Sequence, residues 1–244
     1  SFDGYSKKYL DLARKLSTNR INAIFYIHTQ PIQDNQVFWR QKVYYILEKT
    51  GSLKTNKLDL NLNKFARATG FDPNNIMNKR KLFDIIEVNP NKNDIVDLLA
   101  IENKVGLNAF ITDNPPLFPS DVKEIAKMDG IEIGSHSHTH PVKNNLSAAE
   151  FEFEISKSKE LLENWTGISI KHYAYPSGVF NKKQFELLKK HNYHTAATTK
   201  KKFAGAKKVN KTPYMLPRFG VQNSSYPHLV GDILGLKNRI NQLF

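Results

Sequence analysis

Short apolar runs of strand length alternate with segments of helical period along most of this 244-residue chain. Residues 22–27 form a nearly continuous apolar run, which is typical of a parallel strand buried on both faces, and a helical pattern over 9–16 precedes it. The same alternation predicts strands at 131–133, 172–175 and 195–199, helices at 121–128 and 182–190, and a helix that starts at the capping box of Ser147 and Glu150. Repeated units of this kind predict an α/β fold with a parallel sheet or barrel.

Residues from about 31 to 117 interrupt this alternation. Helical patterns are expected there at 37–47, 62–69, 79–86 and 94–104, joined by connections rich in Asn, Lys and Pro. We therefore predict one domain over residues 1–244 with a mostly helical insertion at about 31–117, which would be a lid over the substrate, a partner surface or a packing element.

Three aromatic side chains lie at helical spacing in this insertion: Trp39, Tyr44 and Tyr45. Aromatic rings of this kind can stack on sugar rings, but such a stripe belongs more often to a hydrophobic core. We predict that these rings are core residues.

Composition narrows the classes of partner. The net charge is +13, but the lysines are scattered among asparagines and form no nucleic-acid-binding motif, so we expect no nucleic-acid partner. An acidic envelope polymer or a solvated surface explains the charge better. No stretch approaches the roughly 20 apolar residues that cross a bilayer. The chain has no cysteine, which excludes disulfides and thiolate metal ligands.

A histidine cluster follows the strand expected at 131–133. His136, His138 and His140 are three of the eight histidines in the chain, and the outer two are four residues apart. Imidazoles at this spacing can converge on one cation, and two neutral imidazoles with one carboxylate form a hydrolytic metal site with open positions. A lone pair of histidines at this spacing is more often a polar surface turn, so other segments must decide.

Two other segments supply that decision. Residues 1–5, Ser-Phe-Asp-Gly-Tyr, place a carboxylate beside a glycine before a helix, and residues 173–178, Tyr-Ala-Tyr-Pro-Ser-Gly, end an aromatic strand in a Pro/Gly turn. With the histidines between them, their order resembles the polysaccharide deacetylase family, also called the NodB-homology or carbohydrate esterase 4 family. Its motifs are Thr/Ser-Phe-Asp-Asp-Gly, His-Ser/Thr-x-x-His and a third that ends in Pro-x-Gly. The resemblance covers residues 1–29 and about 117–221.

This resemblance implies an incomplete, distorted (β/α) barrel whose site lies at the carboxyl ends of the strands. It also implies that Asp3, His136 and His140 bind one divalent metal ion, for which we expect zinc, and that the backbone amide of Ser177 helps to form an oxyanion hole. The middle histidine, His138, occupies a variable position outside the metal shell.

The implied activity is hydrolysis of N-acetyl groups on the amino sugars of a polysaccharide or glycan precursor. A metal ion polarises the amide carbonyl and lowers the pKa of its water, a carboxylate base takes the water proton, and N–H donors stabilise the oxyanion. The partner would be an N-acetylated glycan, at the cell envelope or outside the cell, with a cytoplasmic location left open.

The chain departs from the family pattern in its first motif, which has one Asp instead of two. Aligned from Gly4, Asp3 is the metal ligand and the base is absent; aligned from Phe2, Asp3 is the base. One carboxylate does not easily do both, because coordination neutralises its basicity.

The later motifs also depart from the pattern. Ala174 stands where many members carry an Arg that orients the base, and Arg218 is the nearest substitute, with an ordinary surface arginine as an equal alternative. The family's late Leu-x-His has no match, and we expect His228 to be a surface residue.

Two other functions stay open beside de-N-acetylation: hydrolysis of a small or lipid-linked amide, and glycan binding by a pseudoenzyme that lost the base. Since the first motif lies at Ser1, we also expect that residues before it, and a second Asp beside Asp3, belong to the protein, with an inactive protein as the alternative.

Overall fold

The computed structural model describes residues 1–50, 79–89, 91–141, 146–200 and 211–218. The chain forms two compact units. The first, which we call the sheet unit, comprises Ser1–Tyr5, Leu12–Gln30 and Pro119–Phe244; the second, the helical unit, comprises Ser6–Asp11 and Pro31–Phe118.

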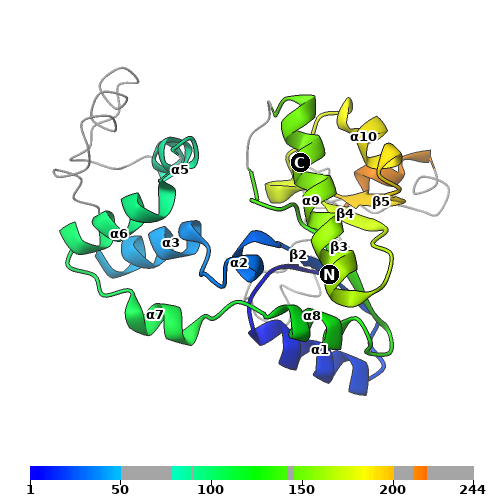
Figure 1. The fold of residues 1–244 in the computed structure, drawn as a ribbon, viewed down its shortest axis with the longest axis horizontal. Coiled ribbons are helices and arrows are strands. Elements are labelled where there is room, and N and C mark those ends of the chain that lie inside the picture. Colours follow the sequence, from blue (N-terminus) through cyan, green and yellow to red (C-terminus); the bar gives the residue numbers. More distant parts are fainter. Residues whose placement is uncertain (51–78, 90, 142–145, 201–210, 219–244) are drawn as a thin grey trace, which may run out of the picture. The chain divides into compact units, whose positions relative to one another are not determined.

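The sheet unit is built on five parallel strands that lie side by side in chain order (Figure 1). They are β1 (Phe2–Gly4), β2 (Ala23–Ile27), β3 (Ile131–Ser135), β4 (His172–Ala174) and β5 (Thr195–Ala197). Beyond β5, Leu216 forms a parallel bridge with Ala197. The predicted α/β fold with parallel strands is confirmed, and its sequential strand order is the one found in (β/α) barrels. All carboxyl ends of the strands therefore meet at one edge.

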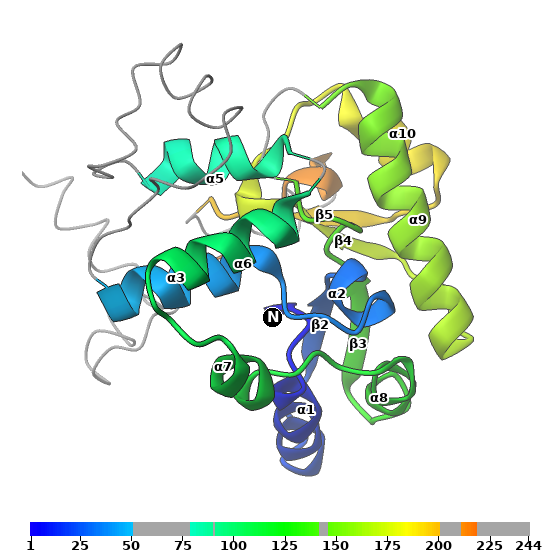
Figure 2. The same cartoon turned by 60° about the vertical axis from the view of Figure 1, so that its left-hand side comes forward.

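Helices cover the sheet. The helices of this part are α8 (Pro119–Ile125), α9 (Ala148–Thr166), α10 (Gln184–Lys190) and, from Leu12 on, α1 (Lys8–Thr18), with short 3₁₀ turns η1 (Pro176–Gly178) and η2 (Pro213–Met215). The short helix α2 (Gln30–Gln33) belongs to the helical unit from Pro31 on. The longest, α9, packs on β3 and is flanked by α8 and α10 (Figure 2). No helix in the described part of the chain is long and apolar enough to cross a membrane.

Local sequence explains the bounds of α9. The capping box is confirmed: the Ser147 hydroxyl accepts from the Glu150 amide, and the Glu150 carboxylate accepts from the Ser147 amide. The helix ends at Gly167, whose φ of 76° lies in the left-handed region that glycine adopts at low cost. Its buried stripe, which includes Phe151, Ile155 and Leu162, faces the sheet unit's core.

The helical unit contains α3 (Trp39–Thr50), α5 (Lys79–Glu87), α6 (Lys92–Glu102) and α7 (Asn108–Asp113). Three of the helices predicted in the insertion, at 37–47, 79–86 and 94–104, are thus confirmed, while the one at 62–69 lies outside the described residues. A buried apolar cluster holds α3, α5 and α6 together; it includes Val43, Ile46, Leu82, Ile86, Val96 and Leu99.

The aromatic residues of α3 divide between core and surface. Trp39 is buried in the cluster and Tyr45 packs partly against it, as predicted, but the prediction is wrong for Tyr44, which is 53% exposed. The reason is helical geometry: five residues after Trp39, a side chain points about 140° away from it around the axis.

A close approach between strands explains the glycine in β3. A Cβ on Gly134 would lie 2.5 Å from the nearest ring carbon of Tyr26 and 3.0 Å from the carbonyl oxygen of His172. Only glycine leaves room for the Tyr26 ring to lie across the sheet at this position.

We predict that Gly134→Ala destabilises the protein by about 1–3 kcal/mol, because the added methyl group forces the Tyr26 ring or the β4 backbone to move. Urea unfolding at equilibrium measures the change. Gly106→Ala is the control, since a Cβ there meets nothing within 4 Å. Equal losses of stability in the two variants would contradict this explanation.

Candidate active site

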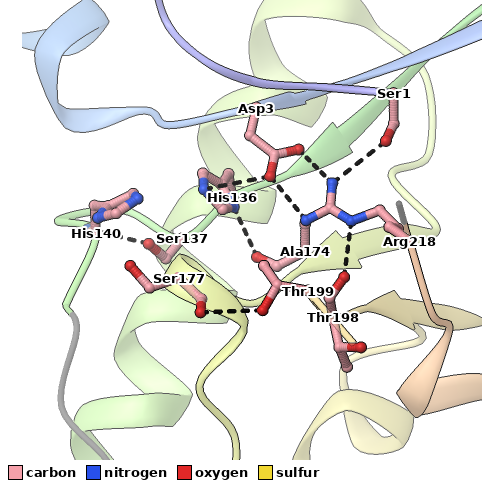
Figure 3. Close-up of polar contacts among 10 residues, drawn as sticks. All are labelled: Ser1, Asp3, His136, Ser137, His140, Ala174, Ser177, Thr198, Thr199 and Arg218. Carbon is pink, nitrogen blue, oxygen red and sulfur yellow. Dashed lines mark hydrogen bonds and ion pairs between the residues drawn. The ribbon is translucent and has the colours of Figure 1, made fainter. Parts of the chain in front are cut away.

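The carboxyl edge of the sheet gathers polar side chains from distant parts of the sequence (Figure 3). Asp3 lies in β1, His136 directly follows β3, Ser177 lies in the turn after β4, and Arg218 follows the segment that pairs beside β5. The structure therefore places the sequence-predicted site residues at the edge where the fold predicts a site.

Asp3 and Arg218 form a bidentate ion pair. Two guanidinium nitrogens of Arg218 donate to the two carboxylate oxygens of Asp3, at 2.6 and 2.8 Å. Arg218 also donates through Nε to the Thr198 carbonyl at 3.0 Å, and its guanidinium lies 5.4 Å from the centre of the Tyr26 ring. Of the two interpretations of Arg218, these contacts favour the residue that orients Asp3 over an ordinary surface arginine.

The ion pair keeps Asp3 ionised. Burial alone would raise the pKa of this carboxyl group, but the hydrogen bonds from Arg218 and the charges of His136 and Arg218 outweigh burial and lower it. The two side chains remain 30% and 17% exposed, so solvent screens part of their attraction.

His136 is oriented by the backbone of β4. Its Nδ1 lies 2.8 Å from the Ala174 carbonyl oxygen, which can only accept a hydrogen bond, so Nδ1 carries the proton and Nε2 presents a lone pair. Nε2 lies 4.0 Å from Oδ2 of Asp3. Burial lowers the pKa of His136 and favours the neutral imidazole, the form that binds metals.

His140 faces His136 from the loop after β3. The two ring centres are 4.9 Å apart, with the rings inclined at 75°. His140 has a left-handed backbone, with φ of 59°, and its amide donates to the Ser137 hydroxyl at 3.0 Å. The middle histidine of the cluster, His138, is held by another partner: its Nδ1 forms a hydrogen bond with the Thr29 hydroxyl at 3.0 Å.

The donor set is of the type that binds zinc, and the spacing of the two histidines suits one ion. Two imidazoles on one tetrahedral zinc have ring centres roughly 5 Å apart, as His136 and His140 do. The donor atoms of Asp3 and His136, 4.0 Å apart, need to approach by roughly half an ångström to share the ion. As they stand, no three histidine or acidic side chains of the described residues form a complete metal-binding group.

Ser177 lies in a strained turn beside this group. Its φ of 53° is left-handed, and its carbonyl oxygen accepts from the Thr199 hydroxyl at 3.4 Å. The residue is exposed in the turn after β4. Strain of this kind is common at functional sites.

Comparisons with known proteins show which family and which solved structure this chain is similar to. The family described as "Polysaccharide deacetylase" matches residues 81–196, which include the histidine loop and the turn after β4. The solved structure of IcaB from Ammonifex degensii has a TM-score of 0.51 at 13% identity, over 93% of this chain and 68% of that one, which is a likeness of fold. Over residues 81–196, this chain matches the polysaccharide deacetylase family.

Two curated proteins are similar over shorter segments. "Uncharacterized protein YlxY" of Bacillus subtilis is 38% identical over 65 residues, 27% of this chain and 20% of that protein. "Peptidoglycan-N-acetylglucosamine deacetylase" of Bacillus cereus is 28% identical over 99 residues, 41% of this chain and 36% of that protein. The matches thus span about a fifth and a third of these relatives. Asp3 and Arg218 lie outside the residues that match the polysaccharide deacetylase family, so their place in the site rests on geometry.

Sequence reasoning missed two residues near this candidate site, His28 and Glu154. His28 follows β2, is fully buried and has its ring centre 5.3 Å from that of His140. Burial and the neighbouring histidines hold its pKa well below the ordinary value. Its position directly after a strand that pairs with β3 is the signal that could have identified it.

We predict that Arg218→Met raises the pKa of Asp3, because the hydrogen bonds and positive charge that keep the carboxylate ionised are removed. An aspartate whose pKa is lower in the folded state than in the unfolded state stabilises the protein at pH values above the unfolded pKa, which is about 3.9. That stability is lost as the pH falls through the pKa of the folded state. The wild type should therefore exceed the variant in stability at pH 7, and the difference should shrink below about pH 4.

Carboxyl ¹³C NMR titration measures the pKa, and urea unfolding measures the stability. Arg14→Met is the matched control, since the Arg14–Glu124 pair is about half exposed and should contribute little. An Asp3 pKa that is unchanged in Arg218→Met would contradict the role given to this ion pair.

Proposed function

We propose that this protein removes N-acetyl groups from the amino sugars of a polysaccharide or glycan precursor, using one divalent metal ion, zinc, bound by Asp3, His136 and His140. The convergence of a buried neutral histidine, a second histidine and an arginine-held carboxylate at one edge of the sheet carries the proposal. Two neutral imidazoles and one carboxylate are the donors of many hydrolytic zinc sites.

Each residue has a distinct task in this proposal. When bound, the ion polarises the amide carbonyl and lowers the pKa of a water molecule. His136 presents Nε2 because Ala174 holds Nδ1, and Arg218 keeps Asp3 ionised and correctly turned. The backbone N–H of Ser177 stabilises negative charge on the substrate oxygen.

We assign Asp3 to metal binding in preference to the role of base. A general base works best when its pKa lies near the working pH, whereas the pKa of Asp3 is lowered. This assignment leaves the first motif, with its single Asp, without a base of its own. That observation favours a second candidate function, glycan binding by a pseudoenzyme.

The substrate class rests on the relatives. The name of the Bacillus cereus protein, a peptidoglycan-N-acetylglucosamine deacetylase, supports an N-acetylated amino sugar as substrate. A cell-envelope or secreted location fits such a substrate, and the insertion at about 31–117 is proposed as part of the same catalytic domain. A small or lipid-linked amide is the alternative that a series of substrates of increasing size would distinguish.

Zinc binding is the first consequence. We predict that His136→Ala and His140→Ala each lose stoichiometric zinc while keeping the circular dichroism spectrum of the fold, because each removes one of three ligands. Elemental analysis after dialysis measures the zinc. His191→Ala, at a histidine that pairs with Glu152 on the surface, should bind zinc like the wild type. Retention of zinc by both site variants would refute the assigned ligands.

Hydrolysis is the second consequence. We predict that the zinc-loaded wild type releases acetate from chito-oligosaccharides and that Arg218→Met reduces kcat by about 10- to 100-fold, since a misplaced carboxylate misorients the site. Enzymatic determination of acetate measures the rate, and Arg14→Met serves again as the control. A zinc-loaded protein that binds the sugars and releases no acetate would favour the pseudoenzyme.

A further inference from the structure

A buried carboxylate holds the loop that carries the histidines. Glu154, on α9, is 5% exposed. Its Oε2 accepts from the backbone amides of His138 and Thr139, both at 2.8 Å, and its Oε1 accepts from the Thr139 hydroxyl at 2.6 Å. A carboxylate out of water is costly unless donors satisfy it, and these three donors all come from one loop.

The loop needs such a restraint because its backbone is strained. Ser137 has φ of 66° and His140 has φ of 59°, both in the left-handed region. Side chains with a Cβ adopt this region rarely, and they keep it only where the surrounding structure holds the backbone. The two amides bonded to Glu154 lie between these strained positions.

The segment after β2 restrains the loop from the other side. The Gln30 amide donates to the His138 carbonyl at 3.0 Å, and the Thr29 hydroxyl bonds Nδ1 of His138 at 3.0 Å. The Phe153 and His138 rings are nearly perpendicular, with ring centres 5.8 Å apart. His138, which the metal site does not use, thus anchors the middle of the loop.

We propose that Glu154 is a positioning residue for the His136–His140 pair: it fixes the backbone at His138 and Thr139 so that the His140 ring faces His136. The proposal rests on the proposed function, in which these two histidines bind the metal. Glu154 acts through the loop backbone, because rotation of the chain at Thr139 would swing the next residue, His140, away from its partner.

Cobalt binding tests the proposal, since Co²⁺ in a zinc site gives visible absorption that reports its ligand geometry. Glu154→Leu keeps the volume but removes all acceptors, and it should weaken Co²⁺ binding by about 10- to 100-fold and alter the absorption spectrum. Glu154→Gln should bind within about threefold of the wild type, because its amide oxygen can still accept from both backbone amides. Glu160→Leu, on the same helix and exposed, is the control.

Rescue by Gln separates positioning from a merely structural role. The proposal is overturned if Glu154→Leu binds Co²⁺ like Glu160→Leu, or if Glu154→Gln is as weak as Glu154→Leu. Should the Leu variant fail to fold, Thr139→Val replaces it, since it removes one of the three donors and should weaken binding by a smaller factor. Unchanged binding and spectrum in Thr139→Val would then count against the proposal.

Amide hydrogen exchange in the metal-free protein keeps this test apart from the proposed function. If the wild type binds no Co²⁺, the proposed function fails. The restraint by Glu154 is then measured directly: the His138 and Thr139 amides should exchange at least tenfold faster in Glu154→Leu than in Glu154→Gln or Glu160→Leu. If Glu154→Leu does not fold, these amides should still exchange faster in Thr139→Val than in Glu160→Leu. Equal exchange rates would overturn the restraint itself.

Discussion

The ion pair between Asp3 and Arg218 is the interaction on which the rest of the site depends. It joins residues 215 positions apart, one in the first strand and one after the segment that pairs beside β5. It links β1, the first strand of the sheet, to the segment that pairs beside β5, the last strand. It also keeps the Asp3 carboxylate ionised and turned toward His136. The Tyr26 ring, which needs the glycine in β3, lies against the same guanidinium.

A second constraint acts on the histidines. The parallel sheet fixes where His136 emerges, because β3 is paired on both sides, but His140 lies four residues further along a loop with two left-handed residues. Its place depends on bonds from α9 and from the segment after β2. The paired strands therefore position one proposed ligand, His136, and a restrained loop positions the other, His140.

Features with a local cause were predictable from the sequence: the apolar run of β2, the capping box of α9 and the outer histidine pair. Features that depend on long-range contacts were not. Nothing local to Arg218 identifies its partner near the start of the chain; only the resemblance suggested an orienting role, with an ordinary surface arginine as an equal alternative. Glu154 looks like one more polar residue of an amphipathic helix. Tyr44 was misjudged because an aromatic residue five positions from a buried one faces away from it.

Anomalous X-ray diffraction at the zinc edge, from crystals grown with saturating zinc, tests the central claim most directly. The account predicts one zinc peak at the carboxyl edge of the sheet, bound by Nε2 of His136, by the His140 ring and by the Asp3 carboxylate at about 2.0–2.2 Å. A zinc peak at other residues only, with the Asp3–Arg218 pair and the two histidines free of metal, would contradict it.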